Sequence, residues 1–189
     1  MVTDPAGGPK HQEEEREAPA VLPDFQTIYT RELSYVLHTL RRLGVAPGEL
    51  EDVTHDCFVA IYRHWSAYDP ARPLRPWLFG FAFRTAADHR KLARHRYEAG
   101  APSHEHADER PRPDELVEEE RLRQALLLAL DAMDFEKRSV IVMHDVEGMP
   151  VPEMARLLGV PLNTAYSRLR LARAELERHL SKTVGGPRG

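Results

Sequence analysis

Residues 152–173 read PEMARLLGVPLNTAYSRLRLAR, and this stretch decides the fold. The small residue Ala155 is followed four positions later by Gly159, and a longer amphipathic segment begins shortly after that glycine. Ala155 permits two helices to cross closely, and Gly159 supplies the turn between them. Pro152 and Pro161 suit the first turn of a helix, where no backbone donor is lost. The stretch therefore predicts a helix-turn-helix.

The second helix of this pair has an apolar stripe and a polar, basic face. We expect the stripe to point inward, through Leu162, Ala165, Leu169, Ala172 and Leu176. The opposite face would enter a major groove of DNA and carries Asn163, Thr164, Tyr166, Ser167, Arg170 and Arg173. An ordinary helical hairpin would show the same periodicity. The coincidence of a small residue, a glycine and a basic outer face favours DNA binding.

Pro-free windows elsewhere in the chain also have the period of helices. Asp24 is placed as the N-cap of a first helix, whose apolar residues are Phe25, Ile28, Tyr29, Leu33, Val36, Leu37 and Leu40. A second helix, at 47–65, has its buried stripe at Leu50, Val53, Cys57, Ile61 and Trp65. A third, at 76–96, opens with an alternating WLFGFAF that also suits a strand, but its basic continuation favours a helix.

The stretch after Tyr97 is polar, rich in Pro and without periodicity, which is typical of a linker. Beyond it, Asp114 is expected to cap a helix that reaches Met133, and Asp134 another that runs through Val146. The chain is thus expected to be all-α, with two small helical domains joined by a flexible linker. The expected divisions are a disordered acidic arm at 1–23, a domain at 24–96, the linker at 97–113, a domain at 114–181 and a tail at 182–189.

The charge of the chain is unevenly distributed. Its 189 residues carry a net charge of -4, which by itself argues against nucleic acid. Between residues 75 and 96, however, six Lys and Arg stand against one Asp, a local net charge of +5, and residues 163–182 carry five basic against two acidic residues. Either segment alone could be a solvated helix face. Two basic segments in an acidic background indicate contacts with phosphates, because counterion release depends on local basic density.

Several function classes are disfavoured. One Cys cannot form an intramolecular disulfide, which favours a reducing, cytoplasmic setting, and Cys57 is interpreted as a small core residue. The longest strongly apolar stretch, 77–83, is far shorter than the ~20 residues of a membrane span, and the N-terminus lacks a signal sequence. His104 and His106 lie in the linker without a rigid shell, so no metal site is expected. No catalytic residue, cofactor or enzymatic motif is predicted.

Three motifs in order resemble those of the sigma-70 family of bacterial RNA polymerase sigma factors, in its extracytoplasmic-function group. They are EDVTHDCF at 51–58 with Trp65, PWL at 76–78 with Asp88 and the basic run, and EMA at 153–155 with Gly159 and TAYSRLRLAR at 164–173. The resemblance covers residues 25–179. It implies a region 2 domain and a region 4 domain, with the domain between them missing.

The resemblance implies a function as well as a fold. A protein of this kind binds core RNA polymerase, through the β′ clamp helices and the β flap, and directs initiation at promoters. It recognises minus-thirty-five and minus-ten elements, melts the latter, and is typically held by an anti-sigma protein. The segment 97–113 could enter the RNA exit path or act as a passive tether, and extended it reaches about 56–61 Å. A helix-turn-helix regulator that senses a ligand or dimerises is the alternative.

The resemblance also assigns site residues. The polymerase-binding face of the second helix would comprise Asp52, His55, Asp56, Val59 and Arg63, with Asp52 as its anchor. Minus-ten contacts would come from Tyr68, Arg72 and Arg84 near an extruded base and from Arg90, Lys91 and Arg94 on phosphates. The minus-thirty-five set comprises Ser167 and Arg170 on base edges, Tyr166 on base or sugar, Arg168 and Arg173 on phosphates, and Asn163 and Thr164. Trp77, Phe81 and Phe83 are expected in the core.

The chain departs from the family's pattern at three places. Members often carry Asn in an Ala-Arg-Asn triplet, where this chain has Ala82-Phe83-Arg84. Tyr166 and Leu171 stand where Lys or Arg is frequent. The base preference at either promoter element therefore does not follow by analogy.

Overall fold

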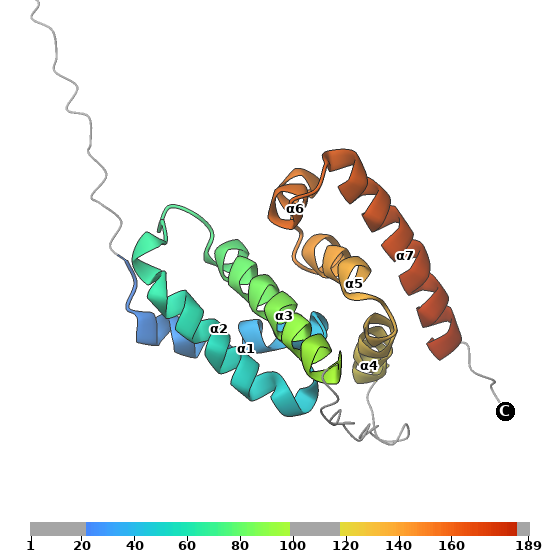
Figure 1. The fold of residues 1–189 in the computed structure, drawn as a ribbon, viewed down its shortest axis with the longest axis horizontal. Coiled ribbons are helices and arrows are strands. Elements are labelled where there is room, and N and C mark those ends of the chain that lie inside the picture. The colour runs from blue at the N-terminus through green and yellow to red at the C-terminus, as the bar shows by residue number, and fades with distance from the viewer. Residues whose placement is uncertain (1–21, 99–117, 185–189) are drawn as a thin grey trace, which may run out of the picture.

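The computed structural model describes residues 22–98 and 118–184, and within these ranges it contains helices and no strand. Figure 1 shows their arrangement. The elements are α1 (Phe25–Arg42), the 3-10 turn η1 (Pro47–Glu49), α2 (Leu50–Arg63), the 3-10 turn η2 (Trp65–Ala67), α3 (Leu74–Glu98), α4 (Glu118–Asp131), α5 (Phe135–Ile141), the π-helical turn η4 (Val142–Val146), α6 (Val151–Leu158) and α7 (Leu162–Val184). The predicted all-α class is confirmed.

The signals that begin and end the helices act as the sequence predicted. The Asp24 side chain accepts a hydrogen bond from the Thr27 N–H at 3.0 Å, and Asp134 accepts one from the Lys137 N–H at 2.9 Å. Gly159 ends α6 with φ of 65°, a left-handed conformation that glycine adopts without a steric penalty. Asp114, the third expected cap, lies outside the described residues.

Some boundaries differ from the predicted ones. The helix α3 begins at Leu74 and runs to Glu98, two residues into the predicted linker. The helix expected from Asp134 to Val146 changes from α to π at Val142. The inward position predicted for Leu162 is wrong, because this side chain is 44% exposed. Leu162 is the first residue of α7, and the buried stripe of that helix begins one turn later, at Ala165.

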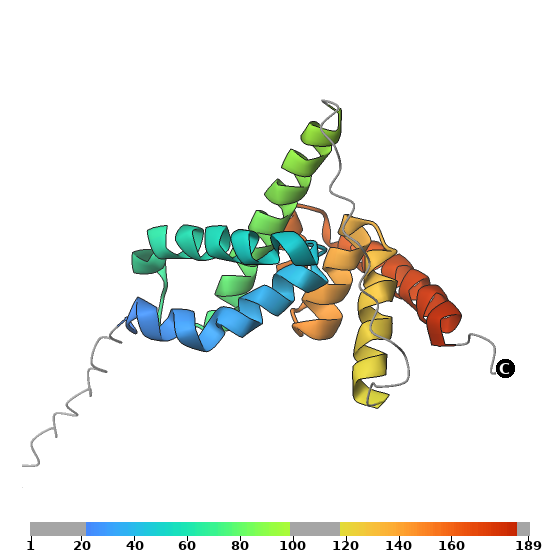
Figure 2. The same cartoon turned by 90° about the horizontal axis from the view of Figure 1, so that it is seen from below.

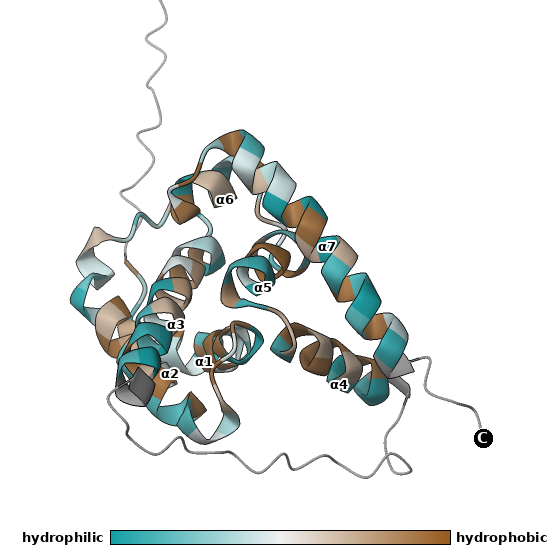
Figure 3. Cartoon of the chain, turned by 45° about the vertical axis from the view of Figure 1, so that its right-hand side comes forward, coloured by the Kyte–Doolittle hydropathy of each residue, from teal (hydrophilic) through white to brown (hydrophobic). Residues whose placement is uncertain are grey.

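The helices form two halves, each packed mainly within itself. In the N-terminal half, α2 and α3 pack on each other and on α1, around a core that includes Leu40, Ile61 and Phe79. In the C-terminal half, α7 packs along α4, α5 and α6. Figures 1 and 2 show these halves side by side, and hydrophobic and hydrophilic turns alternate along α7 in Figure 3. Most helix–helix packing therefore lies within each half, and the buried apolar residues of both halves form one continuous cluster.

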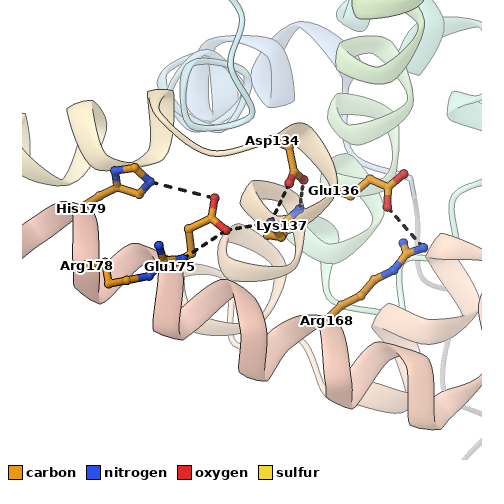
Figure 4. A network of polar contacts seen from close by, with 7 residues as sticks. All are labelled: Asp134, Glu136, Lys137, Arg168, Glu175, Arg178 and His179. Carbon is orange, nitrogen blue, oxygen red and sulfur yellow. Dashed lines mark hydrogen bonds and ion pairs between the residues drawn. The ribbon is translucent and has the colours of Figure 1, made fainter.

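Polar contacts fix α5 against α7 within the C-terminal half. The Lys137 ammonium donates to Glu175 at 2.7 Å and lies 3.0 Å from the carboxylate of its own N-cap, Asp134 (Figure 4). The pKa of Lys137 is raised by these two carboxylates, chiefly by Glu175. Glu175 also lies 3.8 Å from the Arg178 guanidinium on the next turn of α7. This network sets the position of the helix that carries the predicted DNA-reading residues.

The two halves meet through long side chains. Arg41 of α1 makes a bidentate pair with Asp131 of α4, with N–O distances of 2.9 and 2.7 Å. Tyr35 donates a hydrogen bond of 2.6 Å to Glu147. The rings of Phe83 and Phe135 stack across the boundary with centroids 5.8 Å apart. The boundary thus carries polar pairs and an aromatic stack in addition to the apolar cluster that is continuous across both halves.

A buried arginine lies at this boundary. Arg138 of α5 is only 7% exposed, and its Nη1 lies 3.3 Å from Asp131. Burial lowers the pKa of Arg138, and the nearby Arg41 and Arg90 lower it further, against the opposing effect of Asp131. The guanidinium fits against Gly44, which has φ of 98°, and a Cβ at that glycine would clash with Arg138 Nη1. A side chain at this position would strain the backbone and would also force the buried Arg138 guanidinium to shift.

We predict that Gly44→Ala destabilises the protein more than Gly148→Ala. Both residues have positive φ, so alanine costs about 1–2 kcal/mol of backbone strain at either position. Only Gly44 adds a clash, because nothing lies within 4 Å of a Cβ at Gly148. Chemical unfolding of both variants measures the difference. Equal losses of stability would contradict the described fit of Arg138 against Gly44.

Candidate nucleic-acid and polymerase interfaces

The outer face of α7 forms a hollow in the C-terminal half. Among the residues that line it are His144 of η4 and four of the predicted DNA-binding residues, which are Tyr166, Ser167, Arg170 and Arg173. Its volume is about 610 Å³. Tyr166 is 53% exposed although it is a large aromatic residue. A basic and aromatic hollow along a helix-turn-helix suits a DNA groove. We call it the α7 hollow.

One arginine of the α7 hollow is held by a carboxylate. Arg173 Nε donates to Asp145 at 3.0 Å, and Arg173 Nη2 bonds the second carboxylate oxygen. His144 Nδ1 lies 2.9 Å from the same carboxylate. The hydrogen bonds from Arg173 and then His144 hold the pKa of Asp145 below its ordinary value of 3.8. Both partners of Arg173 belong to the π-helical turn η4, a type of turn that is frequent at functional sites.

The remaining predicted residues of α7 lie elsewhere. Arg168 is turned toward α5, where its guanidinium lies 3.3 Å from Glu136 (Figure 4). Asn163 is exposed and Thr164 is half-buried, and neither lines the α7 hollow. The structure thus brings together four of the seven residues predicted for the minus-thirty-five element. Arg168 belongs to a different face because it is one residue from Ser167 and about 100° further around the helix.

A second hollow lies in the N-terminal half at the start of α3. It has a volume of about 680 Å³ and is lined by Tyr68, Arg72, Arg84 and the partly exposed Trp77. Tyr68 stacks on Trp65 with ring centroids 5.3 Å apart, and its hydroxyl donates to the Arg72 carbonyl at 2.6 Å. We call this the α3 hollow. Aromatic faces beside arginines are suited to hold an unpaired base.

Trp77 belongs both to the core and to the α3 hollow. It was expected in the core, where Phe81 lies at 8% exposure. Trp77 is half-buried, packs against the core and contacts the rings of Trp65 and Phe81. It also lines the hollow, which the expectation of a core position alone did not include. The same hollow is also lined by Glu153 of α6, from the other half of the molecule.

The basic side chains further along α3 are separate from the α3 hollow. Arg90, Lys91 and Arg94 are exposed and line a cleft between α3 and the C-terminal half. Lys91 lies 3.2 Å from Asp88, and the Cζ atom of Arg90 lies 5.2 Å from the centroid of the Phe135 ring. The structure thus divides the predicted minus-ten residues into a hollow and a basic helix face.

The stripe predicted to bind a polymerase lies on the surface of α2. Asp52, His55, Asp56 and Arg63 are exposed, and Val59 is half-buried. The opposite side of α2 contributes Val53, Cys57 and Ile61 to the core, as the sequence predicted. Burial raises the pKa of the Cys57 thiol to about 11, which makes it a poor nucleophile and agrees with a packing role.

An exposed aromatic residue beside the α2 stripe was not predicted. Tyr62 is 64% exposed and makes an edge contact with Phe25 at 4.9 Å between ring centroids. Large exposed aromatic residues are enriched at protein interfaces. Its position directly before Arg63, a residue predicted to lie on the polymerase-binding stripe, could have indicated that Tyr62 is near that surface.

The described part of the chain has neither a metal-binding cluster nor a membrane-spanning helix. Residues 22–98 and 118–184 contain no cluster of three or more His, Cys, Asp or Glu that could hold a metal ion. His104 and His106 lie outside these ranges. Within the same ranges, no helix has the length and apolar character needed to cross a membrane.

Comparison with known families gives two matches, one in each half. The family model for sigma-70 region 2 matches residues 28–96, and the model for sigma-70 region 4 matches residues 123–176. The α3 hollow and the α2 stripe lie in the first match. The α7 hollow lies in the region 4 match, except for its lining residue Glu177, which follows the end of that match.

Individual proteins match over most of the chain. The ECF RNA polymerase sigma factor SigE of Mycolicibacterium smegmatis is 28% identical over 165 residues, which cover 86% of this chain and 64% of SigE. The ECF RNA polymerase sigma factor SigL of Mycobacterium tuberculosis is 32% identical over 136 residues, 71% of this chain and 76% of SigL. Among solved structures, CnrH in complex with the cytosolic domain of CnrY aligns with a TM-score of 0.53 and 26% identity, over 83% of this chain and 87% of that one.

We predict that the Arg173–Asp145 pair contributes stability that acid removes. The pKa of Asp145 is lowered in the folded protein, so the contribution is present above its unfolded value and is lost as the pH falls through the folded value. Asp145→Asn should therefore lose less stability than the original protein between about pH 5 and pH 2. Unfolding at a series of pH values measures this, with Asp56→Asn on exposed α2 as the control. Parallel curves for all three proteins would contradict the prediction.

Proposed function

Because the chain belongs to the sigma-70 family of RNA polymerase sigma factors, in the extracytoplasmic-function group, we propose that it directs core RNA polymerase to promoters. Sigma factors are transcription initiation factors, and no catalytic role is assigned to any residue. The observation that carries the proposal is the pair of arginine-bearing hollows, one in the half that matches region 2 and one in the half that matches region 4. Two such surfaces can read two DNA elements at once.

The α7 hollow is proposed to read the minus-thirty-five element. Ser167 and Arg170 line the hollow, and Arg170 has no ion-pair partner among the described residues. We assign both residues to base edges. Tyr166 is assigned to a base or a sugar, and Arg173 to a phosphate. Arg173 must exchange Asp145 for that phosphate, since both anions need the same guanidinium face.

The α3 hollow and the basic face of α3 are proposed to take the minus-ten element. An unpaired base would enter beside Trp77, Tyr68 and Arg84, where aromatic faces and cations lie together. Arg72 is placed at the mouth of the same hollow. The exposed cations further along α3, Arg90, Lys91 and Arg94, are assigned to the phosphates of the adjoining strand.

The described arrangement has to open before both elements are bound. Glu153 of the C-terminal half lines the α3 hollow, and a carboxylate there opposes the entry of a nucleic acid strand. The segment between Glu98 and Glu118 has nineteen residues, which span at most about 63–68 Å. That is sufficient for two elements about one and a half turns of DNA apart. We propose that the halves separate on the polymerase.

Protein partners are proposed for the N-terminal half and for the chain as a whole. The α2 stripe, with Asp52 as its anchor, is proposed to dock on the β′ clamp helices, and region 4 on the β flap. CnrH, whose structure is similar, was solved with the cytosolic domain of CnrY, and a sigma–anti-sigma pairing of that kind is proposed for this chain. Asn163, Thr164 and Arg168 remain predicted minus-thirty-five contacts, and opening of the halves would free the Arg168 side of α7.

We predict that the purified chain makes core RNA polymerase start RNA synthesis at specific promoters. Run-off transcription with core enzyme and a library of promoter fragments measures this. Asp52→Ala should reduce the yield at every promoter, because it removes a polymerase contact and no base contact. If no fragment supported initiation, and the chain alone bound an intact palindrome as a dimer, the protein would be a helix-turn-helix regulator instead.

We predict different effects for two arginines of the α7 hollow. Arg170→Ala should cost about 1–3 kcal/mol of binding and relax the preference at one base pair. Arg173→Ala should weaken binding to all sequences alike and reduce the salt dependence, since its role is a phosphate contact. Titrations of promoter variants with the holoenzyme at two salt concentrations separate these effects. Identical behaviour of the two variants would refute the assignment.

A further inference from the structure

A cleft between the two halves brings together cations that the proposed function uses only separately, on different DNA elements. It lies between α3 and the C-terminal helices α5 and α7, and its volume is about 300 Å³. We call it the interdomain cleft. Its cationic residues are Arg90, Lys91 and Arg94 from one half and Arg168 from the other. The cleft is complete only while the halves are together, because three of these cations come from α3 and the fourth comes from α7.

The interdomain cleft has more positive than negative charge. Arg168 is paired with Glu136 at 3.3 Å, and Lys91 with Asp88 at 3.2 Å. Arg90 and Arg94 make no ion pair with any carboxylate of the described residues. Arg90 instead lies over the ring of Phe135, with 5.2 Å between its Cζ and the ring centroid. Two arginines in one cleft thus lack a counter-charge from residues 22–98 and 118–184.

A buried hydroxyl in the same cleft also lacks a partner. Ser139 of α5 lines the cleft, has no exposed surface, and its Oγ makes no hydrogen bond. An unpaired buried hydroxyl costs free energy, and most such groups in proteins are paired. A hydroxyl and several guanidinium groups around one small volume are the donors that phosphate groups prefer. The aromatic rings of Phe83 and Phe135, at the same site, add flat apolar surface.

The closed arrangement makes this concentration of charge unfavourable without a ligand. Arg138 lies nearby, and its lowered pKa reflects burial together with repulsion by Arg41 and Arg90. An anion that bridged α3 and α7 would relieve the repulsion and hold the halves together. It would also neutralise cations that the proposed function assigns to DNA phosphates, so this consequence, though not the site itself, rests on that function.

We propose that the interdomain cleft binds a small anion with two or more phosphate groups, which bridges the two halves through Arg90 and Arg94 on one side and Arg168 on the other. The Ser139 hydroxyl donates to it from the floor of the cleft. The bound form is the closed one. Release of the anion or competition by promoter DNA accompanies opening.

Calorimetric titration of the full chain with sodium tripolyphosphate, at constant ionic strength, tests the proposal. Constant ionic strength removes general screening as a cause. Arg94→Gln and Arg168→Gln should each weaken binding about tenfold, because each removes a charged hydrogen bond from a different half. Arg156→Gln is the matched control, since it removes an equal charge from exposed α6 outside the cleft. Equal loss in all three variants, or no loss in Arg168→Gln, would overturn the bridging site.

Ser139→Ala separates a ligand role from a structural one. The variant should unfold at the same temperature as the original protein or higher without ligand, because it removes a buried hydroxyl that has no partner. It should nevertheless bind tripolyphosphate more weakly. Unchanged affinity in this variant would overturn the assigned role of Ser139.

Two further ligands identify the source of the phosphates. Equal affinity for tripolyphosphate and a nucleoside triphosphate supports a site for phosphate groups alone. Tighter binding of the nucleotide supports a nucleotide whose base contacts the Phe83 and Phe135 rings. Binding of duplex DNA but of neither small anion would overturn the proposal. No polymerase or promoter is present, so the result is independent of whether the chain initiates transcription.

Discussion

The buried guanidinium of Arg138 is the constraint on which the closed arrangement depends. A cation that is 7% exposed needs a counter-charge, and Asp131 supplies it while also receiving Arg41 from the other half. In its present position the same guanidinium leaves no room for a Cβ at Gly44. Asp131 therefore pairs with a cation from each half, and Gly44 of the N-terminal half packs against the buried Arg138 of the C-terminal half.

This boundary is suited to separation. The Arg41–Asp131 ion pair and the Tyr35–Glu147 hydrogen bond cross it, beside the Phe83–Phe135 stack and the contact of Arg90 with Phe135. The apolar cluster is continuous across the boundary, but most helix–helix packing lies within each half. Water can replace polar contacts of this kind at little net cost. Glu153 of the C-terminal half lines the α3 hollow of the N-terminal half, at the place where the proposed function puts a nucleic acid strand. The closed form is therefore compatible with storage of the protein, and the open form with promoter binding.

Local signals in the sequence predicted much of the fold. Asp24, Asp134 and Gly159 act within one turn of their own position, so their roles could be inferred from neighbouring residues alone. The buried stripe of α2 followed from periodicity in the same way. The four residues of the α7 hollow were predicted because they share one helix face.

Contacts between distant segments could not be predicted. Nothing near Arg168 in the sequence indicates its pairing with Glu136, and nothing near Arg173 indicates Asp145, because both depend on how α5 and η4 pack against α7. The position of Leu162 was wrong for a related reason: it is the first residue of its helix, where the apolar period continues but the packing partner does not.

The distance between the two halves, measured by energy transfer between dyes at Thr30→Cys on α1 and Ser181→Cys on α7, tests the central claim most directly. Cys57 is buried and its pKa is raised to about 11, so it should stay unlabelled. The account predicts high transfer in the free protein and low transfer in an initiation-competent complex with core polymerase and promoter DNA. The same high transfer in both states would contradict it.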